Sequence, residues 1–236
     1  MAEIEGLVRA LREGDGAAKA AAARALRDLA GRAVSWLRPT PLITIAEAGA
    51  IPPLVELLRD GGAKAKAAAA RTLGDLACND ACEVLIAEAG GIPPLVALLR
   101  ARSKKAKDEA AWALRNLARH AAGKLLIAEA GGIPPLVKLL RDGSANARYW
   151  VERALSRLAH NNDANAVAIA AAVRFEALVQ LARRGRVTVG YQLIVHDAGV
   201  PAKRKAALVV AALLRDYVPE FKSAPRDIKT VIASYL

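Results

Sequence analysis

The chain has 236 residues, of which 54% are hydrophobic but only 4% are aromatic, and its formal net charge is +12 at pH 7. No uncharged stretch is long enough to span a bilayer, and we expect no secretory signal, because MAEIEGLVRALREGDG lacks a basic segment followed by an apolar run. The excess of basic residues permits nucleic acid, an anionic membrane surface or acidic proteins as partners, although a long solvated surface also needs charge for solubility.

One segment of 15 residues recurs along the chain. It begins at Ile45 (IAEAGAIPPLVELLR), at Ile86 (IAEAGGIPPLVALLR) and at Ile127 (IAEAGGIPPLVKLLR), and the last two copies are identical at 14 of 15 positions. The spacing is 86 − 45 = 41 and 127 − 86 = 41 residues. A fixed period of this length is typical of a helical repeat array, in which each unit packs only on its neighbours.

The N-terminal residues predict a repeat that lacks its beginning. Leu7, Val8 and Leu11 match apolar residues of the next unit at an offset of 47 residues, which exceeds the period by 47 − 41 = 6. The extra residues fall between positions 30 and 45, where Pro39 and Pro41 indicate a loop with a bent entry into the next helix.

Each complete unit predicts three helices, as residues 80–119 illustrate. Gly90-Gly91 stops a short first helix, because glycine adopts the positive φ that a helix C-terminus often needs. Pro93 lies in the first turn of the second helix, where a missing N–H costs nothing. Ser103 is the expected N-cap of a third helix over about 104–119. The expected core residues of this unit are Leu95, Val96, Leu98, Leu99, Ala110, Ala111, Leu114 and Leu117.

The unit after Leu158 is degenerate. Val173-Arg174 and Glu176-Ala177 stand where the preceding unit has its glycine and proline pairs. An insertion within 183–200 is interpreted as a lid, a short hairpin or a partner loop, and residues 219–236 predict a helix that either caps the array or docks a partner. The predicted organisation is an array over 1–218, with a partial repeat at 1–30, repeats at 45–85, 86–126 and 127–168, a degenerate repeat at 169–218, and a capping helix at 219–236.

The sequence contains no catalytic or metal-binding pattern that we recognise. Cys78 and Cys82 have the wrong spacing for a CxxC redox pair, and His120, His160 and His196 are scattered and join no nucleophile motif. We therefore predict a protein that is not an enzyme and that needs no cofactor or metal. Two reduced thiols favour a cytoplasmic localisation, with a nuclear one as the alternative.

Together these features resemble the armadillo repeat family, which includes the importin-α and β-catenin-like repeats. The resemblance rests on the period near 41, the glycine break, the GIPPLVxLL second helix and the AAWALRNLA third helix. It covers about 4–218 and is strongest over 45–159. It implies an all-α fold, a right-handed α-α superhelix (an armadillo-type solenoid) of about four to five repeats. It also implies that the third helices line a concave groove that binds an extended peptide.

One unit carries the residue pair with which importin-α-like proteins hold nuclear-localisation peptides. Trp112 and Asn116 match that tryptophan–asparagine pair, and their spacing of four places both on one face of the helix. A carboxamide can donate to and accept from a peptide backbone, and an indole offers a flat apolar surface to an aliphatic side chain. The alternative is that Trp112 only fills space between alanine-rich helices.

The other units depart from this pair. Arginine occupies the tryptophan position elsewhere, which favours an acidic or phosphorylated extended segment through bidentate contacts. Alternatively, Arg24–Asp28 and Arg71–Asp75 are only solvated pairs one helical turn apart. The predicted peptide-binding groove consists of Arg24, Asp28, Lys64, Arg71, Asp75, Lys105, Trp112, Asn116, Arg119, Tyr149, Arg153 and Arg157.

Three functions follow from these observations. The favoured one is a non-catalytic protein–protein interaction module that binds an extended, acidic-leaning peptide in the groove. The second is a nucleic-acid-binding protein that uses its rows of basic residues. The third is an importin-α-like receptor for basic nuclear-localisation peptides, against which the arginines at the tryptophan position count.

Overall fold

The computed structural model describes residues 1–31 and 41–184, with side chains described up to Val173. Within these ranges all regular structure is α-helical, in twelve helices. The chain divides into two compact units, Met1–Ala154 and Leu155–Leu236. In the described part, no single helix is long and apolar enough to cross a membrane. The helices α6 (Asp80–Glu88) and α7 (Ile92–Leu98), which are bent by 85° relative to each other, qualify only as a pair and by length and composition alone. The predicted insertion and C-terminal helix fall almost wholly outside the described residues.

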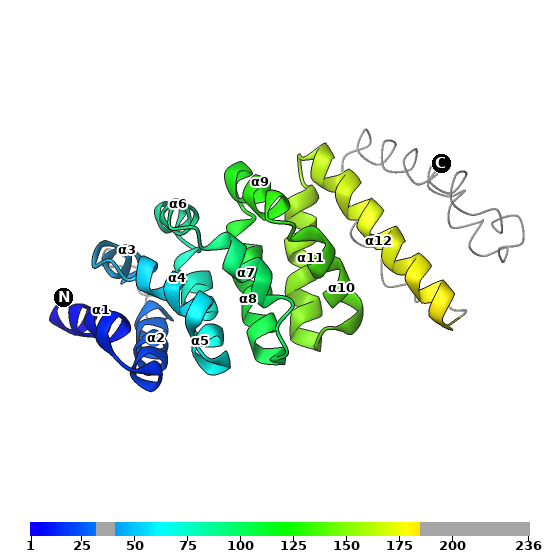
Figure 1. Cartoon of the computed structure of the whole chain (residues 1–236). Coiled ribbons are helices and arrows are strands. Elements are labelled where there is room, and N and C mark those ends of the chain that lie inside the picture. The colour runs from blue at the N-terminus through cyan, green and yellow to red at the C-terminus, as the bar shows by residue number, and fades with distance from the viewer. Residues whose placement is uncertain (32–40, 185–236) are drawn as a thin grey trace, which may run out of the picture. The chain divides into compact units, whose positions relative to one another are not determined.

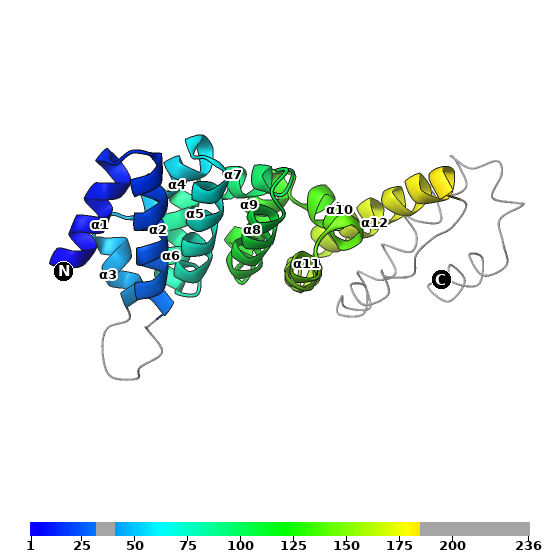
Figure 2. The same cartoon turned by 90° about the horizontal axis from the view of Figure 1, so that it is seen from below.

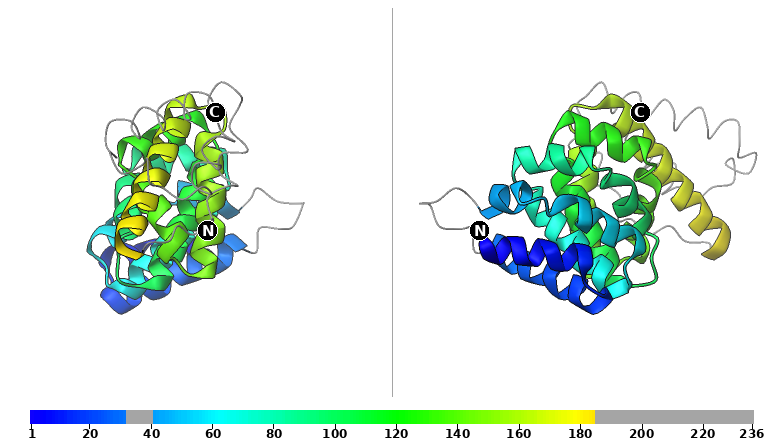
Figure 3. Two further views of the ribbon diagram at one scale, coloured as in Figure 1. Left: turned by 90° about the vertical axis from the view of Figure 1, so that its right-hand side faces the viewer. Right: turned by 60° about the vertical axis from the view of Figure 1, so that its left-hand side comes forward.

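The first unit is a row of helical repeats. It opens with the pair α1 (Ala2–Glu13) and α2 (Gly16–Gly31), and the right-hand view of Figure 3 brings this end of the unit forward. Figure 1 shows the first helices α3, α6 and α9 side by side along one edge of the unit. The three-helix repeats comprise α3 (Pro41–Glu47), α4 (Ile51–Asp60) and α5 (Ala63–Leu76); α6 (Asp80–Glu88), α7 (Ile92–Leu98) and α8 (Lys104–Leu117); and α9 (Ala121–Glu129), α10 (Ile133–Asp142) and α11 (Ala145–Ala159).

Local backbone requirements set the helix ends. Gly49, Gly90 and Gly131 follow the first helices with φ of 79°, 69° and 68°, values that a residue with a Cβ adopts only with strain. A proline pair then occupies the first turn of α4, α7 and α10. Ser103 caps α8, since its Oγ accepts a hydrogen bond from the N–H of Ala106 at 3.2 Å. The predicted glycine breaks, proline starts and serine cap are therefore confirmed.

Small side chains let the third helices approach one another closely. α2 packs on α5 and α5 packs on α8, as Figure 2 shows from below. Ala69 and Ala70 of α5 and Ala110 and Ala111 of α8 are completely buried. The expected core residues of this repeat, from Leu95 to Leu117, are all buried as well. The third helices thus form a continuous layer, whose outer side is the surface on which the predicted site residues stand.

In the second unit, α12 (Asp163–Arg184) fuses what are two helices in the preceding repeats. Its start is capped by Asn162, whose Oδ1 accepts from the N–H of Asn165 at 3.0 Å. The helix continues through Val173-Arg174 and Glu176-Ala177, where the preceding repeat has glycines and prolines. It continues because no glycine with positive φ ends it and no proline restarts it.

Candidate functional site

The predicted site residues differ widely in accessibility. Arg24, Asp28, Lys64, Lys105, Tyr149 and Arg153 are exposed; Arg71, Asp75, Trp112 and Arg119 are half-buried; and Asn116 is buried. Arg157 is half-buried in the last turn of α11 and belongs to the second unit. We call the exposed and half-buried residues of α2, α5, α8 and α11 up to Arg153 the third-helix face.

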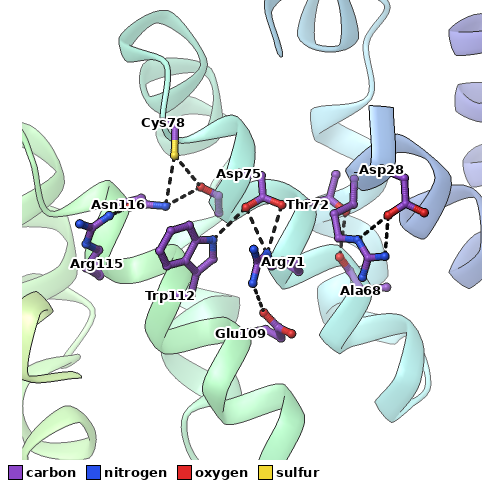
Figure 4. A network of polar contacts seen from close by, with 12 residues as sticks. Asp28, Ala68, Arg71, Thr72, Asp75, Cys78, Glu109, Trp112, Arg115 and Asn116 are labelled. Atoms are coloured by element: carbon purple, nitrogen blue, oxygen red, sulfur yellow. Dashed lines mark hydrogen bonds and ion pairs between the residues drawn. The ribbon is translucent and has the colours of Figure 1, made fainter. Parts of the chain in front are cut away.

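Arg71 is the centre of a polar network that joins α5 to α8 (Figure 4). Its Nε donates to both carboxylate oxygens of Asp75 at 3.1 Å, and its Nη1 lies 3.5 Å from Oε2 of Glu109. Asp75 also accepts a hydrogen bond from Nε1 of Trp112 at 3.0 Å. The Arg71–Asp75 pair expected from the sequence is therefore present, but it is part of a contact between repeats.

One guanidinium, that of Arg71, serves two carboxylates, so the formal charge of this network is 1 − 2 = −1. Burial raises the pKa of Glu109, while the Arg71 guanidinium acts in the opposite direction. Burial acts to lower the pKa of Arg71, but Asp75 and Glu109 outweigh it, so that this pKa is raised. Both carboxylates are thus engaged with a permanently charged guanidinium.

Asn116 is engaged within the chain. It is 1% exposed, and its Nδ2 donates to the carbonyl of Gly74 at 2.8 Å and to Sγ of Cys78 at 3.5 Å. Its Oδ1 accepts from Nη1 of Arg115 at 2.6 Å. The Gly74 carbonyl needs this donor because it lies at the end of α5, where the N–H of Cys78 bonds to Asp75 instead. The role of Asn116 as a peptide clamp stays a prediction, and its amide already has partners.

Trp112 fills the space that Gly74 leaves open. A Cβ on Gly74 would lie 2.7 Å from Cδ1 of Trp112 and 3.0 Å from the Cα of Ala113, closer than a Cβ can approach. Figure 4 shows the indole between Arg71 and Arg115, whose guanidinium carbons lie 5.0 and 5.3 Å from a ring centroid of Trp112. The indole therefore both packs between repeats and contacts two cations.

An aromatic cluster extends from Trp112 to α11. The ring centroids of Trp112 and Trp150 are 4.4 Å apart at 67°, and those of Tyr149 and Trp150 are 4.5 Å apart at 73°, both edge-to-face. Arg153 lies 4.6 Å from the centroid of Tyr149. Sequence reasoning did not include Trp150, nor Glu109 and Arg115 of α8. The signal for Trp150 was its spacing of three from Arg153, which places both on one side of the helix.

The remaining predicted residues lie apart from this cluster. Asp28 pairs with Arg27, whose Nε and Nη2 donate at 2.9 and 2.6 Å, and no pair between Asp28 and Arg24 forms. Arg119 donates to the carbonyl of Cys78 at 3.0 Å and to the carboxylate of Asp80, so it ties α8 to the turn after α5. Cys78 and Cys82 are both free thiols. Among the described residues, no group of His, Cys, Asp and Glu could hold a metal ion.

Comparisons with known proteins agree with this architecture. Residues 39–78 and 79–119 match the model of the Armadillo/beta-catenin-like repeat, and the two matches contain α3–α5 and α6–α8. An engineered protein of known crystal structure is 28% identical with a TM-score of 0.71, over 100% of this chain and 98% of that chain. A designed armadillo repeat protein is 22% identical with a TM-score of 0.70, over 92% and 94% of the two chains.

A further similar structure is one of computationally designed armadillo repeat proteins for modular peptide recognition, at 22% identity and a TM-score of 0.69, over 98% of both chains. The search among curated proteins found no match. The repeat matches, the all-α solenoid and the period of 86 − 45 = 41 residues agree. Residues 39–78 and 79–119 are therefore armadillo repeats, and the rest of the described chain resembles designed armadillo repeat proteins in its fold.

Proposed function

We propose that this chain is a non-catalytic binding module that holds an extended, acidic-leaning peptide segment on its third-helix face. The observation that carries this proposal is an imbalance of available charge. Arg24, Lys64, Lys105 and Arg153 are exposed, and none of them forms an ion pair within the part of the chain that the structure describes.

The acidic side chains near these cations are already paired. Asp28 accepts from Arg27, Asp75 accepts from Arg71 and Trp112, and Glu109 pairs with Arg71. Four exposed cations therefore face an approaching peptide, against one formal negative charge that the Arg71 network leaves unbalanced. Such a surface attracts carboxylates or phosphates and repels lysine and arginine.

The aromatic cluster adds an apolar contact surface beside the cations. Tyr149 is 46% exposed, although Trp112 and Trp150 are half-buried. A tyrosine ring next to Arg153 suits a peptide in which an aliphatic or aromatic residue neighbours an acidic one. The proposed ligand is therefore a segment that alternates acidic and apolar side chains.

The family supports peptide binding in general but leaves the charge of the peptide open. One designed armadillo repeat protein, 23% identical to this chain with a TM-score of 0.68, has been solved in complex with the peptide (KR)4. That protein shows that an armadillo repeat fold can bind a charged peptide. The unpaired cations of the present chain favour the opposite charge.

The test compares an acidic octapeptide, (DE)4, with (KR)4, each labelled with fluorescein and titrated at low salt by fluorescence anisotropy. The test variant carries Arg24→Gln, Lys64→Gln, Lys105→Gln and Arg153→Gln. Trp112 and Asn116 are left unchanged because they support packing. The control variant removes the same charge from exposed positions on α1, α4 and α10 and in the turn after α7: Arg9→Gln, Arg59→Gln, Lys138→Gln and Arg100→Gln.

We expect (DE)4 to bind the wild type in preference to (KR)4. The test variant should lose about tenfold or more in affinity, since each exposed ion pair contributes about 0.2–1 kcal/mol. The control variant should lose clearly less. A preference for (KR)4 would support a receptor for basic peptides instead, and an equal loss in both variants would show that only net charge matters.

Single-stranded nucleic acid is the second candidate, favoured by the exposed Tyr149 beside Arg153 and by the net charge of +12. A labelled oligothymidylate distinguishes the two. Phosphate contacts release counterions, so its affinity should fall much more steeply with salt than that of (DE)4. Oligothymidylate binding that is tighter than peptide binding and equally sensitive to the test variant would move nucleic acid to first place.

A further inference from the structure

The first helices expose large apolar side chains at equivalent positions of two repeats. Val84 and Leu85 of α6 are 56% and 41% exposed, and Leu125 and Leu126 of α9 are 54% and 36% exposed. The two pairs are one period apart, since 125 − 84 = 41 and 126 − 85 = 41. Both pairs lie within the first unit, on a different row of helices from the third-helix face.

Each apolar pair lies on a helical side that also carries an exposed glutamate. Ala81, Val84, Leu85 and Glu88 have the spacing i, i+3, i+4 and i+7, which aligns them along one side of α6, and all four are exposed. Ala122, Leu125, Leu126 and Glu129 repeat this arrangement on α9. The opposite sides hold Ile86 and Ile127, which are completely buried. We call Val84, Leu85, Glu88, Leu125, Leu126 and Glu129 the first-helix ridge.

The glutamates of the ridge are not explained by local stability. Glu88 and Glu129 are the last residues of α6 and α9, where the helix dipole disfavours an anion. Neither forms an ion pair within the described residues. The guanidinium of Arg59 lies beside the neighbouring Gly90, 3.3 Å from where a Cβ would stand, yet Glu88 does not pair with it. In a chain of net charge +12, the ridge is therefore an apolar surface with an acidic border.

We propose that the first-helix ridge docks an amphipathic, basic helix of a partner protein. The partner's apolar stripe packs on the valine and the leucines, and its flanking lysine or arginine side chains face Glu88 and Glu129. α6 and α9 lie side by side along one edge of the unit (Figure 1), and the apolar pairs occupy equivalent positions on these two helices. An amphipathic helix places apolar anchors at i, i+3, i+4 and i+7, which suits two such pairs in sequence.

Charge distinguishes this occupant from two others. An anionic membrane surface would meet the unpaired glutamates and be repelled. A symmetric contact with a second copy of the chain would bring the same glutamates of both copies into one patch. A basic amphipathic helix instead turns both exposed glutamates into contacts with an opposite charge.

The test uses two synthetic helical peptides as probes, one built only from leucine and lysine and one only from leucine and glutamate, both patterned with one apolar side. Binding is followed by fluorescence anisotropy. The first variant carries Val84→Gln, Leu85→Gln, Leu125→Gln and Leu126→Gln, which keeps good helix formers at exposed positions. The second carries Glu88→Lys and Glu129→Lys. The four-glutamine variant of the third-helix face serves as the control, and circular dichroism checks that each variant is folded.

Because the third-helix face is itself proposed to bind acidic and apolar segments, the two peptides are compared on its four-glutamine variant. There we expect the leucine–lysine peptide to bind at least about tenfold more tightly than the leucine–glutamate peptide. The net charge of the chain opposes this preference, so it has to come from the local glutamates. The glutamine variant should lose about tenfold or more, the lysine variant should reverse the preference, and the control should bind the leucine–lysine peptide like the wild type.

Three results would overturn the proposal. One is equal binding of both peptides to the four-glutamine variant of the third-helix face, and another is a preference that survives Glu88→Lys and Glu129→Lys. The third is self-association of the wild type in analytical ultracentrifugation that the glutamine variant abolishes, which would make a second copy the occupant. Because the ridge and third-helix variants share no residue, a failure here leaves the acidic-peptide proposal untouched.

Discussion

Replacing Asn116 by alanine tests whether a single side-chain amide holds two repeats together. Asn116 of α8 is 1% exposed, and its Nδ2 supplies a hydrogen bond to the Gly74 carbonyl of α5 at 2.8 Å. Without it, the remaining contact of that carbonyl is the Cys78 thiol at 3.8 Å, which is a weak donor. We therefore expect Asn116→Ala to weaken the contact between α5 and α8.

The magnitude follows from the burial of the carbonyl. A buried acceptor that loses its partner costs about 1–3 kcal/mol. The other interaction of the amide, with Nη1 of Arg115, involves a half-buried side chain that water can reach, so its loss adds little. The expected loss is about 2 kcal/mol in the free energy of unfolding.

Urea denaturation followed by circular dichroism measures this loss. The matched control is Asn146→Ala, which removes the same group from an exposed position of α11 and should change the free energy by less than about 0.5 kcal/mol. The slopes with urea have to agree among the three proteins, because repeat arrays can unfold in parts. If Asn116→Ala proved as stable as Asn146→Ala, the amide would not hold the repeats together. It would then be available to a peptide, as the sequence first suggested.

Three further predictions concern packing and pH. Gly74→Ala should destabilise the chain by about 1–3 kcal/mol, because its Cβ would collide with Trp112. As the control, Gly6→Ala in α1, where a Cβ would have nothing within 4 Å, should stabilise the chain by about 0.5–1 kcal/mol. Equal effects of the two substitutions in urea denaturation would contradict the assigned collision. Thr72→Val should cost about 1 kcal/mol in the same assay. The buried Oγ1 of Thr72 lies 2.8 Å from the Ala23 carbonyl oxygen and 2.9 Å from that of Ala68, and donates its one hydrogen to either. An unchanged urea midpoint would show that the hydrogen bond from Thr72 to Ala23 of the preceding repeat contributes nothing. Burial raises the pKa of Glu83, and His120 and Arg119 only partly offset this effect, so ionisation of Glu83 lowers folded stability as pH rises from the unfolded pKa near 4.5 through the raised folded pKa. Glu83→Gln should therefore have a higher melting temperature than the wild type near neutral pH and lose this advantage below about pH 4. A wild type that is the more stable near neutral pH would show that the ion pairs dominate.

The sequence alone was enough to locate the breaks between the helices of the repeat at 80–119. Gly90 ends α6 because glycine adopts a positive φ without strain, and Pro93 lies in the first turn of α7 because no backbone N–H is needed there. The same rule accounts for α12, where Val173 and Glu176 replace the residues that would have broken the helix. The core residues between Leu95 and Leu117 were equally predictable, because their spacing matches the turn of one helix.

The roles of the site residues depended on the tertiary structure. Trp112 and Asn116 do lie on one side of α8, as their spacing requires, but their polar atoms are bonded to Asp75 and Gly74 of the preceding repeat. Asp28 pairs with its neighbour Arg27, although Arg24 lies one turn away. Spacing within a helix determines which residues share a side. It does not determine which atoms of another helix, about 40 residues earlier in the repeat, come within hydrogen-bonding distance.

The sequence by itself thus determined the repeat, its helices and its core, because these depend on local backbone geometry and on the periodicity of apolar residues. Only the tertiary structure decided which polar groups form hydrogen bonds or ion pairs within the chain and which remain exposed. Arg71 and Asn116 form such bonds, whereas Arg153 and Glu88 remain exposed. The physical reason is that polar partners are chosen by distances of about 3 Å, and such distances are set by how closely the alanine-rich helices pack on one another.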